Sequence, residues 1–149
     1  MKNIICITLL LFSMVVNAQN IRQKHFLLEK NTAISGYDPV SYFSNKPLKG
    51  KANLTYNYEG INYRFANPNN LETFKKTPEK YEPAYGGWCA YAMGAKGEKV
   101  EVDPENYRIY EGKLYLFYKN FFSNTLDDWK KEEVKLKKQA DSNWTKTFK

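Results

Sequence analysis

Residues 54–68 have the sequence LTYNYEGINYRFANP, and this segment contains the clearest structural pattern of the chain. Apolar and polar side chains alternate on both sides of Glu59 and Gly60. Alternation with a period of two around a glycine-containing turn predicts a β-hairpin. Asn67 and Pro68 are residue types that favour a helix N-cap and a first helical position, so we expect a helix directly after the hairpin.

The remaining patterns predict one α+β domain. A second hairpin is expected at 107–118, around Glu111 and Gly112, and short helices at 77–81 and 88–93. Residues 34–43 are expected to be β-rich, with a break at Pro39. Apolar residues at 126–140 share one helical face, which predicts a C-terminal amphipathic helix. The expected fold is therefore a small, mostly antiparallel sheet from two hairpins, with short helices and the C-terminal helix packed across it.

The first 18 residues have the three parts of a cleavable signal peptide. These parts are Lys2, an apolar run over 4–16, and Ala18 at the expected cleavage point. The run is shorter than the roughly 20 apolar residues that span a bilayer. We therefore expect export to a periplasm or to the exterior, no membrane span after cleavage, a polar lead-in at 19–33, and the domain at 34–149.

The chain is basic, with 23 Lys and Arg against 16 Asp and Glu and a formal net charge of +7. Lysines are concentrated between residues 130 and 149. Such a surface attracts nucleic acid or anionic lipid in some proteins. The simpler interpretation for an exported protein is a solvated helix face, and no nucleic-acid partner is predicted.

Cys89 is the one thiol left after removal of the expected signal peptide, because Cys6 lies within that segment. In a helix over 88–93, Cys89 would occupy the first turn, where unpaired N–H groups and the helix dipole favour a thiolate. The alternative is a small, inert, buried side chain, since free cysteine is among the most buried residue types.

A soft-metal site is one hypothesis for this thiol. Met93 lies four residues after Cys89 and would share its helical face. A Cys and Met pair suits Cu(I), and His25, the one imidazole of the chain, is the third possible ligand. The predicted metal set is therefore Cys89, Met93 and His25, with copper as the ion; the alternative for Met93 is a core side chain.

A small-molecule site is the second hypothesis. Tyr37, Tyr85 and Trp88 are expected beside Cys89, because tyrosine and tryptophan combine a flat apolar face with a polar group. Core positions explain most of the other aromatic residues. No third group is identifiable that would orient a Cys and His pair, so no catalytic residue is predicted and a non-enzymatic role is favoured.

Several motifs occur in an order that resembles a known family. They are GYDPVSYF at 36–43, YEG at 58–60, YRFAN at 63–67, TPEKY at 77–81, YGGWCA at 85–90, DP at 103–104 and EGKLYL at 111–116. Together with Trp129, Ala140-Asp141 and Asn143-Trp144, this order resembles the YHS domain, and most closely an exported single-domain branch of it. The resemblance covers roughly residues 34–144 and implies the fold of that family.

Metal-associated YHS domains have cysteines at three positions that correspond here to Ser41, Ala66 and Asn70. None of the three is a thiol, and a site of that type requires thiolates. The resemblance therefore implies the fold of the family without its cysteine site.

The leading functional hypothesis is an exported, non-enzymatic YHS-family binding domain for a soft metal such as copper, or for a small molecule, near Cys89. A thiol-dependent redox or sulfur-handling protein that acts through Cys89 is the first alternative. A structural or interaction module is the second. The first two hypotheses require that the sulfur be reachable from solvent.

Overall fold

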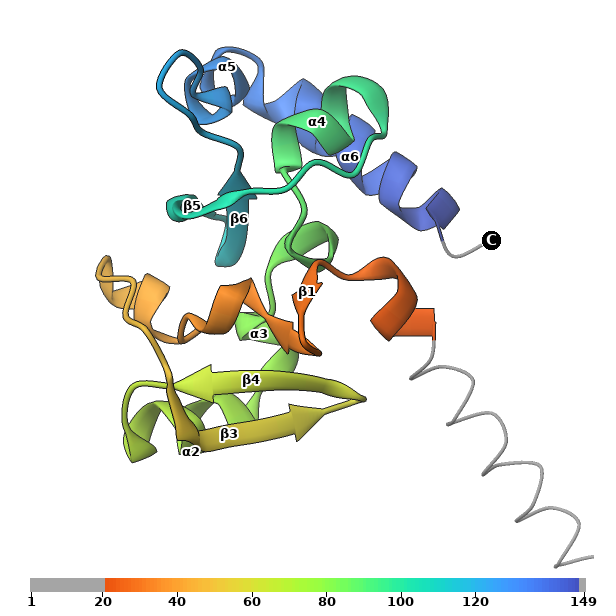
Figure 1. Cartoon of the computed structure of the whole chain (residues 1–149). Helices are drawn as coiled ribbons and strands as arrows, with labels where there is room; N and C mark the ends of the chain where they lie inside the picture. The colour runs from red at the N-terminus through yellow and green to blue at the C-terminus, as the bar shows by residue number, and fades with distance from the viewer. Residues whose placement is uncertain (1–20, 148–149) are drawn as a thin grey trace, which may run out of the picture.

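The computed structural model describes residues 21–147, which form an α+β protein with two packed halves (Figure 1). The N-terminal half contains a four-stranded sheet, and the C-terminal half contains a two-stranded hairpin and the longest helix described. The predicted α+β class is confirmed. The signal peptide expected at 1–18 lies outside the described residues.

The N-terminal half is organised around the predicted hairpin, now β3 (Lys51–Tyr58) and β4 (Ile61–Phe65). The sheet order is β1-β2-β4-β3, with β1 (Leu28–Glu29) antiparallel to β2 (Thr32–Ala33) and β2 parallel to β4. Strand β4 alternates between its two faces: its odd-numbered apolar side chains are fully buried, whereas its even-numbered polar ones are half-buried.

Helix α2 (Pro68–Lys76) covers the inner face of this sheet and begins as the sequence predicts. The side chain of Asn67 accepts a hydrogen bond from the Asn70 N–H at 2.9 Å, which is the N-cap interaction. Phe74 on α2 lies with its ring centre 4.8 Å from that of Tyr63 and 5.2 Å from that of Phe65. These contacts make Phe74 the centre of the first core. Helix α3 (Pro78–Tyr81) follows and leads towards the second half.

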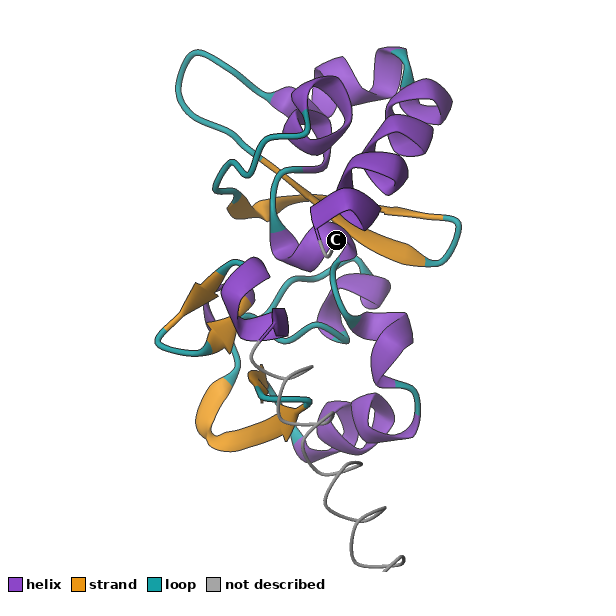
Figure 2. Cartoon of the chain, turned by 90° about the vertical axis from the view of Figure 1, so that its right-hand side faces the viewer, coloured by secondary structure: helices purple, strands orange, loops and turns teal. Residues whose placement is uncertain are grey.

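The C-terminal half places helices on one side of the hairpin β5 (Asp103–Tyr110) and β6 (Lys113–Phe117) (Figure 2). Helix α4 (Ala90–Lys96) packs closely on α6 (Glu133–Thr147), and α5 (Thr125–Lys131) adds the buried Trp129. A Cβ atom on Gly94 would lie 2.6 Å from the Leu136 carbonyl oxygen, so this glycine permits the helix contact.

Three expectations about this architecture are wrong in detail. The two hairpins belong to separate sheets. Residues 34–43 contain the 3-10 segment Ile34–Gly36 and the start of a second at Ser41–Ser44, with no strand. The C-terminal helix is two helices, because the backbone of Glu132 leaves the helical conformation (φ −137°, ψ 35°).

The described part of the lead-in, residues 21–33, contains regular secondary structure. Residues 21–25 are helical, and β1 and β2 add two short strands to the first sheet. Phe26 and Leu28 pack against the first core. This segment lies beside the boundary between the two halves, which the C-terminal end of α6 also reaches (Figures 1 and 2). No helix within residues 21–147 has the length and apolar character needed to cross a bilayer.

Candidate functional site

Cys89 lies inside the protein, one residue before α4, at its N-cap rather than in its first turn. Its sulfur is 3.4 Å from the Thr125 hydroxyl oxygen and accepts a hydrogen bond from the Tyr118 N–H at the same distance. The side chain is fully buried. The thiol therefore contributes to packing between the end of β6 and the starts of α4 and α5, and this conformation gives it no access to solvent.

The other two predicted metal ligands have separate environments. Met93 is 1% exposed and belongs to the second core. His25 is half-buried in the lead-in, where its Nδ1 lies 3.0 Å from the ammonium of Lys99. Among residues 21–147, no group of three or more His, Cys, Asp and Glu side chains is arranged to hold a metal ion. The geometry therefore adds no support to the predicted copper site.

Tyr37 and Trp88 lie away from the cavity that Tyr85 lines. The Tyr37 hydroxyl donates to Glu105 at 2.7 Å, and this hydrogen bond raises the pKa of Tyr37 to about 12. The indole N–H of Trp88 donates to the His25 carbonyl oxygen at 2.7 Å. Of the four residues predicted to surround a small molecule, only Tyr85 lines the cavity between the two halves that is described below.

Asp38 is the centre of a buried polar cluster. Its Oδ1 accepts hydrogen bonds from the N–H groups of Val40 at 2.9 Å and Ser41 at 3.3 Å. Its Oδ2 accepts from the Ala66 N–H at 2.9 Å and from the Asn70 amide at 2.6 Å. The side chain is fully buried, and a buried carboxylate needs such donors.

The donors around Asp38 include the three positions at which the resemblance places cysteines in metal-associated YHS domains. Ser41, Ala66 and Asn70 come from three different segments, and all three meet at one carboxylate. Hydrogen bonds to Asp38 therefore join these three segments of the chain. This cluster therefore contributes to holding the fold together.

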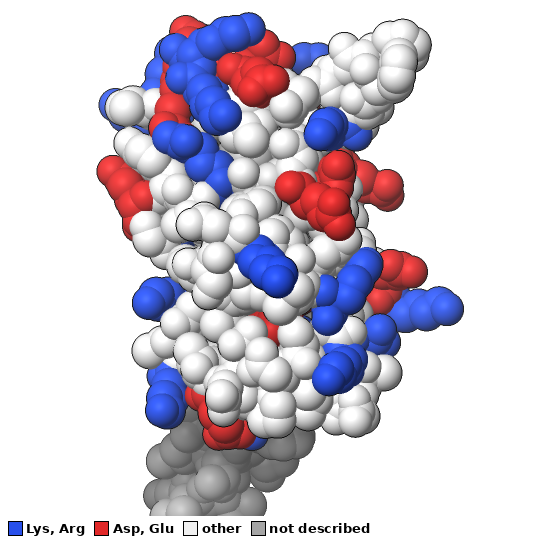
Figure 3. Space-filling model, turned by 90° about the vertical axis from the view of Figure 1, so that its left-hand side faces the viewer, with Lys and Arg blue, Asp and Glu red and all other residues white. Residues whose placement is uncertain are grey.

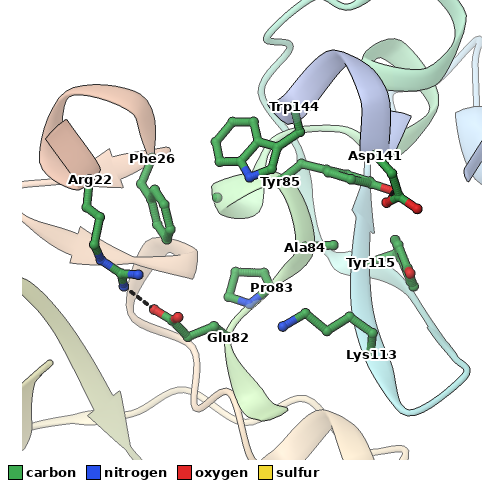
Figure 4. A pocket seen from close by; sticks show the side chains of 11 residues that line it. Arg22, Phe26, Glu82, Pro83, Ala84, Tyr85, Lys113, Tyr115, Asp141 and Trp144 are labelled. Atoms are coloured by element: carbon green, nitrogen blue, oxygen red, sulfur yellow. Dashed lines mark hydrogen bonds and ion pairs between the residues drawn. The ribbon is translucent and has the colours of Figure 1, made fainter. Parts of the chain in front are cut away.

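The cavity between the two halves is the strongest candidate site and has a volume of about 410 Å³ (Figure 4). Its apolar walls come from distant parts of the chain: Phe26 from the lead-in, Pro83 and Tyr85 near the 3-10 segment Ala84–Gly87, and Trp144 from α6. Its polar groups are Arg22, Glu82, Lys113 and Asp141. Pockets of this size and mixed lining are typical of small-molecule sites.

Backbone geometry at Gly86 brings the aromatic walls together. Tyr85, Gly86 and Gly87 all have positive φ angles, of 54°, 61° and 90°. A Cβ atom on Gly86 would lie 2.9 Å from the rings of both Phe26 and Trp144. Glycine is therefore required at this position for two reasons, its left-handed conformation and the close approach of two rings.

Most charges of the cavity already have partners. Arg22 pairs with Glu82 and, at 3.1 Å, with Glu59. Glu82 also accepts a hydrogen bond from the Tyr63 hydroxyl; burial and this carboxylate raise the pKa of Tyr63. The second carboxylate of the cavity, that of Asp141 on α6, accepts a hydrogen bond from the Tyr85 hydroxyl at 2.9 Å.

Lys113 differs from the other charged groups of the cavity. It forms no ion pair among residues 21–147, and its Nζ donates to the Glu79 carbonyl oxygen at 2.6 Å. Burial lowers the pKa of Lys113, against the opposing effect of Glu82 and Glu79. A partly desolvated ammonium without a carboxylate partner is stabilised by an anion placed beside it.

Elsewhere on the surface, charged side chains of both signs lie close together (Figure 3). On the face shown in Figure 3, Lys and Arg groups alternate with Asp and Glu groups. Lysines of α5 and α6 pair with acids one turn away, as in Lys131 with Asp128 and Lys135 with Glu132. This pairing agrees with a solvated helix face.

Sequence reasoning missed most of this cavity because its residues are far apart in the chain. Arg22 and Phe26 lie in a segment predicted to be a polar lead-in. Lys113 is the first residue of β6 and is not among the residues predicted to bind a ligand. The paired glycines after Tyr85 were the one available indication. Comparisons with family models, with curated proteins and with solved structures give no match.

Proposed function

We propose that this chain is an exported, non-enzymatic binding protein of YHS-like fold, whose ligand is a small organic anion with a flat apolar group. The ligand would occupy the cavity between the halves, with its apolar group against Phe26 and Trp144 and its carboxylate beside Lys113. The observation that supports this most is the half-buried Lys113 ammonium, which lacks an ion pair among the described residues.

The apolar walls favour a ring-containing ligand. Phe26 and Trp144 lie with ring centres 6.0 Å apart in a tilted arrangement, and Trp144 also contacts Tyr85 edge-on at 6.5 Å. An aromatic ligand gains offset or edge-to-face contacts with such rings in addition to burial of apolar area. The polar groups at the opposite side of the cavity then fix its orientation.

A binding role is favoured over catalysis because the carboxylates of the cavity are already engaged. Glu82 is held by Arg22 and Tyr63, and Asp141 is held by Tyr85 and, at 3.1 Å, by Lys137. A general base needs to be within hydrogen-bond reach of a substrate proton. Neither carboxylate is free for that task.

The metal and thiol versions of the hypothesis have less support. Both depend on a reachable Cys89 sulfur, whereas this sulfur is buried and accepts a backbone hydrogen bond. Reaction at this atom would require opening of the packing between α4 and α5. The cavity between the halves, which does not contain Cys89, is therefore the better location for a ligand.

Calorimetric titration with phenylacetate and 2-naphthylacetate, each compared with its neutral amide, tests the proposal. The acids should bind at least about tenfold more tightly than the amides, because one charge-assisted hydrogen bond contributes about 1.5–3 kcal/mol. K113M should remove this difference. K119M is the matched control, since Lys119 is an exposed lysine outside the cavity and its replacement should change nothing.

Localisation of the ligand completes the test. Amide shifts in a ¹H–¹⁵N spectrum should cluster at Gly86, Ala84 and Tyr115 on addition of the acid, and W144A should weaken binding of acid and amide alike. Equal binding of acid and amide, or an equal loss in K113M and K119M, would overturn the proposal. That result would favour the interaction-module alternative.

A further inference from the structure

A second cavity, of about 320 Å³, lies on the outer face of the four-stranded sheet, away from the cavity between the halves. Its lining includes Lys30 from the β1–β2 turn, Ser35 and Gly36 from the first 3-10 segment, Lys49, and Arg64 from β4. Almost all of this lining is polar. The set contains three cationic side chains and one carboxylate, that of Glu29.

Arg64 is placed here by the alternation of β4. Its neighbours Tyr63 and Phe65 point into the core and are fully buried, so Arg64 points to the opposite face. There its side chain crosses Gly36: a Cβ atom on that glycine would lie 3.6 Å from both Cδ and Nη1 of Arg64. The Arg64 side chain therefore packs alongside Gly36 at the wall of the cavity.

Lys49 is also oriented by its surroundings. Its Nζ donates to the Ser35 carbonyl oxygen at 3.2 Å and lies 4.0 Å from the centre of the Tyr37 ring. A cation held by a carbonyl group and an aromatic face remains charged and able to bind an anion. Lys49 and Arg64 thus approach the first 3-10 segment from two sides.

The backbone at this cavity has an unusual conformation. Ile34, Ser35 and Gly36 are three consecutive residues with positive φ, at 55°, 48° and 78°. For a β-branched residue such as Ile34 this conformation is rare and costs energy. The strained turn brings Ser35 and Gly36 to the wall of the cavity.

None of the three cations forms an ion pair among residues 21–147, although Glu29 lines the same cavity. Three unpaired cations in one polar hollow repel each other, and an anion bound between them removes that repulsion. Arginine presents a planar fork that matches two oxygens of a phosphate or sulfate group, and lysine adds a point charge.

We propose that this cavity binds a tetrahedral oxyanion, present as a phosphate or sulfate group on a small ligand, with Arg64 and Lys49 as its main contacts. Ser35 and Lys30 complete the site. The proposal does not depend on the proposed function, because the two cavities share no lining residue.

Titration of the ¹⁵N-labelled protein with inorganic phosphate at constant ionic strength tests this proposal. The backbone amide signals of Ser35 and Gly36 should shift as phosphate is added and should stop shifting when the site is saturated. R64Q should weaken binding at least about tenfold, and R64K should weaken it less, because it keeps the charge but loses the fork. K76Q is the control, since Lys76 is an exposed lysine of α2 outside this cavity.

Comparison of glycerol phosphate with glucose 6-sulfate distinguishes a phosphate group from a sulfate group. The compound with the lower dissociation constant carries the group that the site prefers. K49Q gives the same test if R64Q does not fold, as checked by the amide spectrum. Two results would overturn the proposal: amide signals of many lysines that shift in proportion to the phosphate concentration without saturation, or equal effects of R64Q, K49Q and K76Q. Either would mean that phosphate binds only weakly and non-specifically to surface lysines.

Discussion

Replacement of Asp38 by alanine should destabilise the protein severely, and the size of the effect follows from its hydrogen bonds. The buried carboxylate accepts four hydrogen bonds, two at each oxygen. A donor left without a partner in the interior costs about 1 kcal/mol or more. Asp38→Ala should therefore lower the free energy of unfolding by about 4 kcal/mol, a large share of the roughly 5–15 kcal/mol of a typical domain.

Asp38→Asn separates the loss of acceptors from the loss of volume. The amide keeps the shape of the carboxylate but has one acceptor oxygen and one NH₂ group. Whichever way it turns, the NH₂ group faces two donors that the carboxylate had accepted. About half of the alanine effect, roughly 2 kcal/mol, should therefore appear in Asp38→Asn.

Urea unfolding followed by far-UV circular dichroism measures both changes. Asp103→Ala is the control, because the Asp103 carboxylate accepts one exposed hydrogen bond, from the Glu105 N–H at 2.9 Å. It should cost less than about 1 kcal/mol. If Asp38→Ala costs no more than Asp103→Ala, the carboxylate does not hold these segments together, and the structural interpretation of the cluster is refuted.

Two further predictions concern burial. The Cys89 thiol should react with Ellman's reagent far more slowly in the native protein than in guanidinium chloride, because its sulfur is buried; fast native reaction below about pH 8.5 would restore the redox alternative. Burial also raises the pKa of Tyr42, Tyr63 and Tyr85. These phenols stay protonated in the folded state, so their stabilisation is complete below about pH 10 and is lost as the pH rises above it. The last part of the increase in absorbance at 295 nm, from these three phenols, should then coincide with loss of the dichroism signal; ionisation of all 12 tyrosines near pH 10 without unfolding would contradict this.

Local patterns in the sequence identify most elements of the fold correctly. The hairpin at 51–65 follows from alternation and from the Glu59-Gly60 turn, and the start of α2 follows from Asn67 and Pro68. Each of these signals depends on residues within a few positions of one another. Elements specified in this way are the ones that sequence reasoning recovers best.

Features that depend on distant contacts were missed. No pattern in the sequence of the two hairpins indicates that each belongs to a different sheet. The break between α5 and α6 occurs at Glu132, without a glycine or proline to mark it. Residues 34–43 have strand-forming composition, yet the buried Asp38 and its hydrogen bonds impose turns instead. Tertiary interactions thus override local propensity at these places.

The candidate sites were predicted less well than the fold for the same reason. Cys89 attracted attention because it is chemically distinctive, but its burial is decided by Thr125 and Tyr118, about 30 residues away. Arg22 and Glu82 are 60 residues apart and have no motif in common. A pocket assembled from such residues has no compact signature in the sequence.

The position of the main cavity has a physical cause in the two-core architecture. The protein has two cores, one around Phe74 and the other around Trp129, and β6 contributes to both: Leu114 and Leu116 belong to the first, and Tyr115 and Phe117 to the second. Strand β6 therefore lies between the two cores, and its residues Lys113 and Tyr115 line the cavity beside them. The lead-in then covers this cavity, since the Leu27 N–H donates to the Gly86 carbonyl oxygen at 2.9 Å and Phe26 meets Trp144. A ligand in the cavity would touch both halves and the lead-in at once, so its binding must stabilise their packing together.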